Sequence, residues 1–193
     1  MPATNTNTTL RPFRDVSEHE IVNLFAMSGF VGLTGYFPKG TFVKVVSGVA
    51  PNQSLVDGGP VGGFNPPRAF SRRYAVPSQV APCTASGDIA IGVTLFDVRE
   101  VDENNVPLLF NKAKQAQLQA VLSGEAVPFA TRGLFLWSGL GVATLTPGQP
   151  VYLGANSAVT GVPAGITPTA TKIGQCFGVD YTNNWALLKL HLA

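Results

Sequence analysis

The residues with the clearest chemical potential form one basic and aromatic cluster in NPPRAFSRRY. Three arginines and two aromatic residues share it: Arg68, Phe70, Arg72, Arg73 and Tyr74. Such a mixture can neutralise phosphates and stack on the bases of single-stranded nucleic acid. The other basic residues are scattered and the net charge is only +2, so the footprint is small for that partner. Arg, Phe and Tyr are also enriched at protein interfaces. We therefore expect a protein contact here and no direct nucleic-acid partner.

Residues suited to catalysis or metal binding are sparse. His19 and His191 have no Cys or His neighbours at metal-ligand spacing. The acidic run at 97–105 is interrupted by Arg99 and lacks the turn glycine of a calcium loop, so it predicts a solvated hairpin tip. The glycines of 57–64 do not have the spacing or the strand-to-helix context of a phosphate-binding loop. We predict no enzyme: no catalytic, cofactor-binding or metal-binding residues.

The composition indicates many short strands with a neutral surface. Charged residues make up 12% of the chain, about half the usual share of roughly 25%. Residues 133–171 contain no charge at all, yet Gly, Pro, Thr and Asn interrupt them repeatedly, which is typical of closely spaced turns. No signal peptide or membrane-spanning run is evident. Cys83 and Cys176 permit one disulfide, but two reduced thiols in a cytoplasmically made protein are favoured.

Alternating apolar residues locate the strands. KGTFVKVVSG predicts one strand, and GDIAIGVTLFDVREV (87–101) predicts a second with Ile89, Ile91, Val93 and Leu95 on one face. The remaining strand candidates follow one another closely: EAVPFATRGLFLW, PVYLG, SAVTG, KIGQCFGVDY and WALLKLHL. Their spacing suits a compact β-sandwich or β-barrel.

Two segments have helical character. Residues 111–124 contain Ala, Lys, Gln and Leu with Gly124 as a C-terminal cap, and predict the single short helix. Ser17 and Glu20 have capping-box spacing before Ile21, Leu24 and Phe25, which permits either a short helix or an extended arm packed on a neighbour.

The whole pattern predicts a mainly β fold with an extended N-terminal arm and a long irregular loop. We place the arm at 1–37 and a single β-rich domain at 38–193. The loop covers 50–87, and its length is typical of functional or partner-ordered segments.

The last 70 residues resemble the capsid cement, or head decoration, proteins of tailed bacteriophages. The similarity consists of a Gly-led strand with an aromatic finish, a "GxPVY" strand, a piece ending in "VT", an "IGxxxG" strand and an apolar C-terminal strand. It is carried by Gly124, Gly133, Phe135, Gly148, Pro150, Val151, Tyr152, Val159, Thr160, Ile173, Gly174 and Gly178. The added arm, loop and helix are departures from that pattern.

The resemblance implies a virion structural protein that binds the outer surface of the major capsid protein lattice and cements the expanded head. It implies a homo-oligomer, with a trimer expected and a dimer as the alternative, located on the capsid exterior after assembly in the host cytoplasm. No cofactor and no membrane partner are expected. We expect the capsid or inter-subunit contacts in the arm and the loop: Leu10, Phe13, Arg14, Ile21, Leu24, Phe25, Arg68, Phe70, Arg72, Arg73 and Tyr74.

Two alternatives stay open from the sequence. A phage tail or tube component is also strand-rich and assembles through arms. A carbohydrate- or host-surface-binding module would use Trp137, Tyr152 and Trp185 as stacking platforms, although such residues in a strand-rich domain are more often core.

Overall fold

A computed structural model describes residues 10–26, 36–46, 79–122, 124–138, 142–161 and 171–192. Within these ranges the chain is mainly β, with its strands in three groups and one short α-helix, which confirms the predicted fold class. The 3-10 helices are η1 (Glu18–Glu20), η3 (Leu108–Phe110), η4 (Val142–Thr144) and η5 (Ala155–Ser157). No helix in these ranges has the length and apolar content needed to cross a membrane.

The first group is a six-stranded antiparallel sheet in the order β1-β10-β14-β13-β11-β12. Its strands are β1 (Leu10–Pro12), β10 (Arg132–Ser138), β11 (Pro150–Leu153), β12 (Val159–Gly161), β13 (Lys172–Asp180) and β14 (Trp185–His191). In β10 and β14, buried residues alternate with half-buried or exposed ones. One face of this sheet is therefore core and the other faces outward.

The second group is a small barrel in which the strand pairing closes on itself in the order β2-β5-β4-β6-β9. Its strands are β2 (Ile21–Ala26), β4 (Phe42–Val46), β5 (Gln79–Pro82), β6 (Gly92–Thr94) and β9 (Ala126–Ala130). Neighbouring residues of β4 enter different cores: Phe42 packs with the six-stranded sheet, whereas Val43 packs with Val127 and Phe129. The barrel wall is thus apolar on both sides where it meets that sheet.

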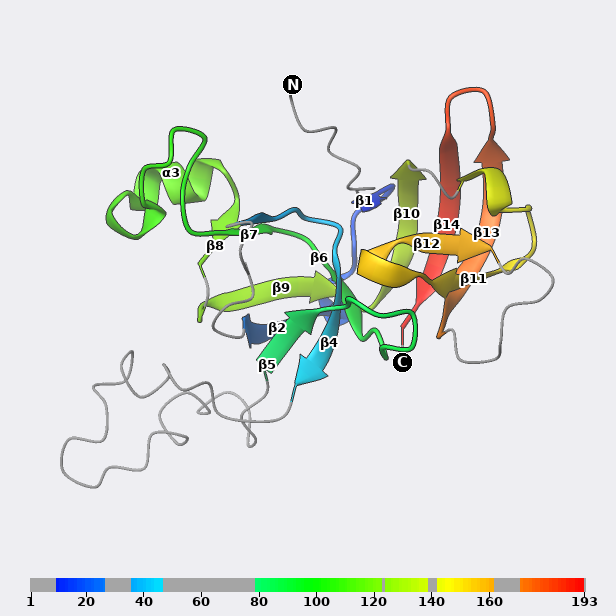
Figure 1. Cartoon of the computed structure of the whole chain (residues 1–193), viewed down its shortest axis with the longest axis horizontal. Helices are drawn as coiled ribbons and strands as arrows, with labels where there is room; N and C mark the ends of the chain where they lie inside the picture. Colours follow the sequence, from blue (N-terminus) through cyan, green and yellow to red (C-terminus); the bar gives the residue numbers. More distant parts are fainter. Residues whose placement is uncertain are drawn as a thin grey trace.

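The third group is a three-stranded sheet of β3 (Tyr36–Phe37), β7 (Asp97–Arg99) and β8 (Ala120–Val121), beside the helix α3 (Lys112–Gln117). Val98 and Val121 join the second core, so this sheet packs on the barrel. Figure 1 shows the barrel strands between α3 on one side and β11–β14 on the other.

The predicted helix over 111–124 is shorter in the structure. Asn111 caps it by accepting a hydrogen bond from the Lys114 main-chain N–H, and α3 ends at Gln117. Gln119 has a left-handed backbone (φ 50°), after which β8 pairs with β7. Burial of Ala120 and Val121 therefore overrides the helical preference of this segment.

The predicted strand over 87–101 divides between two groups. Residues 92–94 form β6 of the barrel, residues 97–99 form β7 of the three-stranded sheet, and the chain bends at 95–96 between them. Val93 is fully buried while Ile89 is exposed, so the predicted common face is wrong. The range expected to be loop, 50–87, contains β5 from Gln79 onward, and residues 50–78 lie outside the described residues.

The described part of the N-terminal arm is extended and is incorporated into the body of the protein. β1 pairs with β10 of the six-stranded sheet, and β2 pairs with β9 and β5 of the barrel. Between them Ser17 precedes a single 3-10 turn without a side-chain cap, so the capping-box helix does not form.

Candidate functional site

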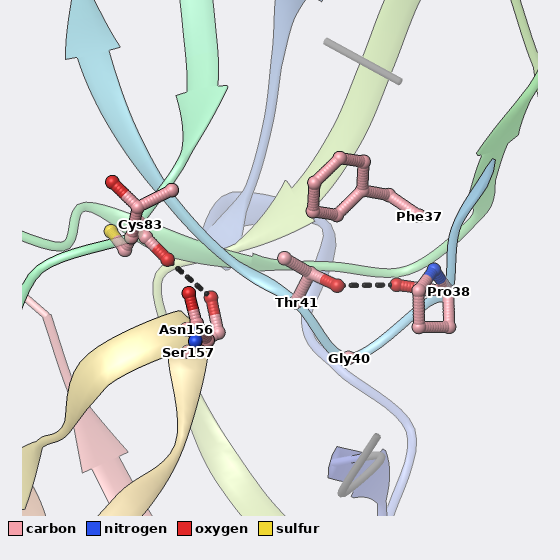
Figure 2. Close-up of a pocket in the computed structure, with 8 residues that line it drawn as sticks. Phe37, Pro38, Gly40, Thr41, Cys83, Asn156 and Ser157 are labelled. Atoms are coloured by element: carbon pink, nitrogen blue, oxygen red, sulfur yellow. Dashed lines mark hydrogen bonds between the residues drawn. The ribbon is translucent and has the colours of Figure 1, made fainter. Parts of the chain in front are cut away.

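A small hollow lies where the barrel meets the six-stranded sheet. It has a volume of about 110 Å³ and is lined by the β3–β4 turn, the residues after β5 and η5. Figure 2 shows the side chains around it, including Thr41, Cys83 and Ser157. Consecutive residues Asn156 (φ 54°) and Ser157 (φ 59°) both have left-handed backbones. For residues other than glycine this conformation is costly, so surrounding contacts must hold it.

Those contacts connect the two strand groups. Ser157 Oγ lies 3.0 Å from the Cys83 carbonyl oxygen and 3.3 Å from that of Phe42, and the Asn156 N–H donates to the Thr84 carbonyl oxygen at 3.0 Å. On the opposite wall, Thr41 Oγ1 donates to the Pro38 carbonyl oxygen at 2.6 Å. The hydroxyl groups of Thr41 and Ser157 are therefore engaged with main-chain oxygens, which is a structural use of them.

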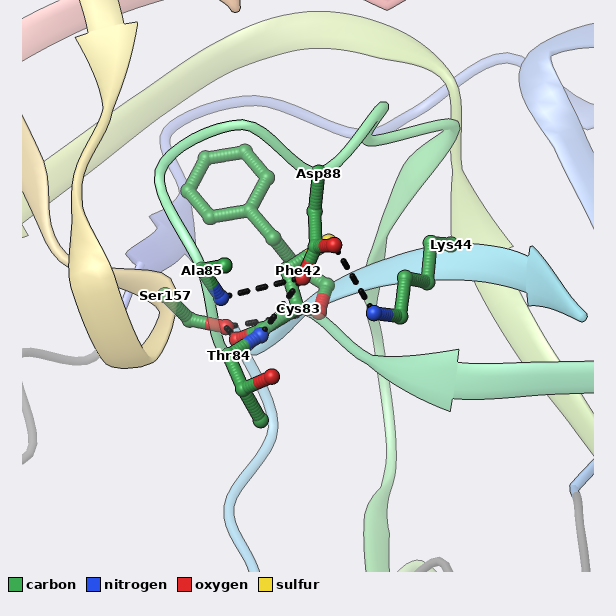
Figure 3. Close-up of polar contacts among 7 residues, drawn as sticks. All are labelled: Phe42, Lys44, Cys83, Thr84, Ala85, Asp88 and Ser157. Atoms are coloured by element: carbon green, nitrogen blue, oxygen red, sulfur yellow. Dashed lines mark hydrogen bonds and ion pairs between the residues drawn. The ribbon is translucent and has the colours of Figure 1, made fainter. Parts of the chain in front are cut away.

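Asp88 organises the loop beside this hollow (Figure 3). Its carboxylate accepts hydrogen bonds from the main-chain N–H groups of Thr84 (2.9 Å) and Ala85 (3.0 Å), and forms an ion pair with Lys44 at 2.8 Å. The hydrogen bond from Lys44, followed by that from Ala85, holds the pKa of Asp88 below its usual range. The carboxylate thus closes the 84–88 turn onto β4.

The two cysteines are buried free thiols, as the sequence analysis favoured. Burial, and then the nearby charge of Asp88, raise the pKa of Cys83 to about 12. Burial also raises the pKa of Cys176. Because the thiolate is the reactive form, both groups are poor nucleophiles at neutral pH.

The structure separates the residues predicted to make capsid or inter-subunit contacts. Leu10 is only 2% exposed and belongs to the core of the six-stranded sheet, so its side chain faces inward, away from any partner. Phe13 (49% exposed) and Arg14 are on the surface. Ile21 and Leu24 are half-buried in β2, where Leu24 packs against the second core.

The other predicted contact residues lie partly or wholly outside the described residues. The main chain of Phe25 pairs with Gln79 and Ala126. The basic and aromatic residues of the loop, Arg68, Phe70, Arg72, Arg73 and Tyr74, lie outside the described residues.

Sequence reasoning missed an exposed apolar group that follows the acidic run. Val106, Leu109 and Phe110 are 49%, 57% and 85% exposed, while Leu108 between them is fully buried. The apolar segment VPLLF is visible in the sequence, but it is too short to show a helical or strand periodicity. We call the surface formed by Glu100, Glu103, Val106, Leu109 and Phe110 the acidic tip; Asp102 is buried beneath it.

A second surface that was missed is the outward face of the six-stranded sheet. Lys172, Gln175, Lys189 and His191 border an open hollow there. The Lys189 ammonium lies 5.7 Å from the centre of the Phe177 ring, which is 49% exposed. We call the surface formed by Leu134, Leu136, Lys172, Gln175, Phe177, Leu187, Lys189 and His191 the basic face.

The aromatic residues considered as sugar platforms do not share one environment. Trp137 is buried in the core, and Tyr152 and Trp185 are half-buried, with Tyr152 opposite Lys172 in the sheet register. Within the described ranges no three His, Cys, Asp or Glu side chains are placed to hold a metal ion together. Comparison with known proteins finds no family model, no curated protein and no solved structure that matches this chain significantly.

Proposed function

We propose that this chain is a structural protein of the virion that decorates and stabilises the expanded capsid of a tailed bacteriophage. In this role it binds the outer surface of the major capsid protein lattice as a homo-oligomer, a trimer or else a dimer, and acts without enzymatic activity or a cofactor. Its location is the capsid exterior, after assembly in the host cytoplasm.

The proposal is supported by one observation above all: ten of the twelve residues that carry the resemblance to cement proteins fall within a single sheet. These ten lie in β10, β11, β12 and β13, which all belong to the six-stranded sheet: Gly133, Phe135, Pro150, Val151, Tyr152, Val159, Thr160, Ile173, Gly174 and Gly178. At Gly174 an added Cβ would lie 2.2 Å from the Lys189 carbonyl oxygen, so glycine is required for the pairing of β13 with β14. The shared pattern thus describes how this sheet is built.

Exposed apolar side chains agree with a role in assembly. Contiguous apolar patches on a protein surface usually mark contacts with other macromolecules. A decoration protein binds in many copies, so a modest contact in each copy is sufficient for stable coverage.

The direct test is co-sedimentation with purified heads of the phage whose genome carries the gene. We expect saturable binding to expanded heads, weaker binding to unexpanded heads, and a higher temperature of genome release from decorated heads. Protein that remains in the supernatant with expanded heads at every concentration would contradict the proposal.

The predicted arm contact needs point substitutions instead of a truncation. Removing residues 1–25 would delete β1 and most of β2, and so would damage both the sheet and the barrel. Phe13→Ser and Arg14→Ala change exposed side chains without touching a strand. If the arm contacts the lattice, these variants bind expanded heads more weakly than Lys39→Ala, an exposed control in the β3–β4 turn.

A further inference from the structure

The basic face is the outward side of three neighbouring strands, β10, β14 and β13 (Figure 1). The inward side of the same sheet packs on barrel residues such as Phe42, so the basic face is turned away from the barrel. Cross-strand register sets its composition, because Leu136 lies opposite Leu187 and Leu134 lies opposite Lys189. The face thus presents apolar side chains beside amino groups.

Two lysines border the hollow of this face. Lys172 and Lys189 line it together with Gln175 and His191, and its volume is about 380 Å³. The Lys189 ammonium group lies 5.7 Å from the centre of the Phe177 ring. Because the face of an aromatic ring attracts a cation, this contact favours the position of the ammonium group at the hollow.

The positive charge of these two lysines is not balanced within the described part of the sheet. Neither lysine forms an ion pair with a described carboxylate. The strands β11 and β12 continue the sheet beside Lys172, and all of 133–171 is free of charged residues. The one carboxylate in the strands of this sheet, Asp180, is at the far end of β13 and accepts hydrogen bonds from the N–H groups of Thr182 and Asn183.

The carboxylates of neighbouring elements are engaged or balanced. Asp88 belongs to the loop that is hydrogen-bonded to Thr171, but its carboxylate is already in an ion pair with β4. At the opposite end of the face, three arginines stand against three carboxylates in 11–20 together with Arg132. There Glu20 Oε2 lies 3.8 Å from Arg132 Nε. The excess of positive charge is therefore at the hollow.

We propose that the basic face docks on the capsid lattice and receives an acidic, partly apolar segment of the major capsid protein. A carboxylate of that segment occupies the hollow between Lys172 and Lys189, and its apolar side chains contact Leu134, Leu136 and Leu187. Opposite charges across an interface favour the correct partner and speed its encounter. The inference rests on the proposed function, and it names the surface of this chain and the chemistry of the partner.

The composition of the face favours a protein as the occupant. A nucleic acid would be bound mainly through several phosphates, for which two lysines are few, and it would leave the leucines of the face unmatched. A second copy of this chain offers few free carboxylates, since Glu103 and Glu125 are paired with Lys114 and Lys112. The docking uses one face of each copy, so it leaves the rest of the surface for a closed trimer or dimer.

The first test is co-sedimentation of full-length variants with purified expanded heads. Lys172→Glu and Lys189→Glu should each raise the dissociation constant about tenfold, and the double variant about a hundredfold. Both side chains are exposed, so the melting temperature should stay unchanged. Lys39→Glu, the same charge change in the β3–β4 turn, is the matched control and should bind as the wild type does. Added salt should weaken the wild type more than the double variant.

A titration without heads separates this inference from the proposed function. The probe is a short soluble peptide of Glu and Leu residues, added to the labelled wild-type protein and followed by NMR. We expect saturable shifts of the amide signals of Gln175, Phe177 and Lys189. A matched peptide in which Gln replaces every Glu should cause much smaller shifts.

Three results would overturn the inference: a double lysine variant that binds expanded heads like the wild type, a Glu and Leu peptide that leaves the signals of the basic face unchanged, or a single-stranded oligonucleotide that binds this face more tightly than the peptide. Wild-type protein that leaves expanded heads bare would instead contradict the proposed function, and with it the capsid protein as the occupant.

Discussion

The six-stranded sheet and the α3 region differ in how far they bury their apolar side chains. The sheet hides large apolar side chains, including Phe135, Trp137 and Leu188, and turns charged residues outward. Among the described residues, the α3 region has a small core of Leu108, Ala120 and Leu122 with Leu118 packed against it. It exposes Leu109 and Phe110 and is held together by the carboxylate of Glu125. Glu125 accepts hydrogen bonds from Gln115 Nε2 at 2.6 Å and the Leu122 N–H at 3.0 Å, and forms an ion pair with Lys112 at 3.1 Å.

The difference indicates which region contributes most to the free energy of unfolding and which region leaves apolar surface exposed. Burial of apolar area is the dominant favourable term in folding, so the six-stranded sheet should dominate the free energy of unfolding. A region that leaves apolar side chains in water gains little stability from them. Its exposed apolar groups are available for contact with another molecule.

The largest effect should come from the sheet core. Phe135→Ala removes a fully buried ring and should lower the free energy of unfolding by about 3–5 kcal/mol. Urea denaturation followed by circular dichroism measures this. The matched change Leu136→Ala, at a half-buried outward position next in the strand, should cost less than half as much. Equal losses in the two variants would contradict the assignment of the faces.

A second pair of variants tests how β1 is attached to the sheet. Gly40 (φ 87°) and Gly148 (φ 83°) share a left-handed backbone, but an added Cβ at Gly40 would lie 2.4 Å from the Leu10 carbonyl oxygen, whereas Gly148 has open space. Gly148→Ala should cost about 1–2 kcal/mol from the backbone alone. Gly40→Ala should cost more in the same denaturation assay, because β1 must also shift. If Gly40→Ala proves no worse than Gly148→Ala, the close packing of β1 is wrong.

Acid should loosen the α3 region before the sheet. Burial raises the pKa of Glu125, but the hydrogen bonds from Leu122, Lys112 and Gln115 outweigh it, so the net pKa is below the ordinary value. A carboxyl group with a lowered folded pKa stabilises the fold above its unfolded pKa, about 4.3, and this contribution is lost as the pH falls through the folded value. Amide signals of α3 followed by NMR during acidification should change before those of β13 and β14.

Glu125→Gln provides the control for that titration. It keeps the shape of the side chain but removes the charge, so α3 should already be loosened at neutral pH and change less on acidification. The expected loss of stability is about 1 kcal/mol, as for a partly exposed hydrogen-bond group. Identical acid profiles in the wild type and the variant would assign the transition to other carboxyl groups.

The smallest effect on stability should come from a change in the acidic tip. Phe110→Ser replaces the most exposed large apolar side chain of the described residues, and should change the free energy of unfolding by no more than about 0.5 kcal/mol. Thermal melting measures this. A large loss would mean that the ring packs within its own chain, which would remove the contrast between the two regions.

The same contrast explains what could be predicted from the sequence. The last two strands were predictable, because alternation in WALLKLH and KIGQCFGVD follows directly from a sheet with one buried face. EAVPFATRGLFLW, expected as one strand, instead divides into β9 of the barrel and β10 of the six-stranded sheet. The segment from 87 to 122 was not. There, β6, β7 and β8 have two or three residues each, and their partners are distant in sequence, so local pattern could not separate strand from helix at Ala120 and Val121.

The candidate surfaces were also beyond sequence reasoning. Lys172 and Lys189 lie in the consecutive strands β13 and β14, and they border the same hollow because these strands pair antiparallel with a register shift near Cys176. Conversely, Leu10 was assigned to a partner contact because the arm lacked any pattern of its own. Its burial depends on β10, more than a hundred residues later.

The pairing of β1 with β10 also sets the order in which the molecule can be completed. During synthesis, residues 10–12 must wait until 132–138 have left the ribosome, and β10 itself pairs with β14 at 185–191. Contacts between such distant segments slow folding, because a long loop must close before they form. The nascent chain therefore exposes an edge of this sheet until β14 has been made.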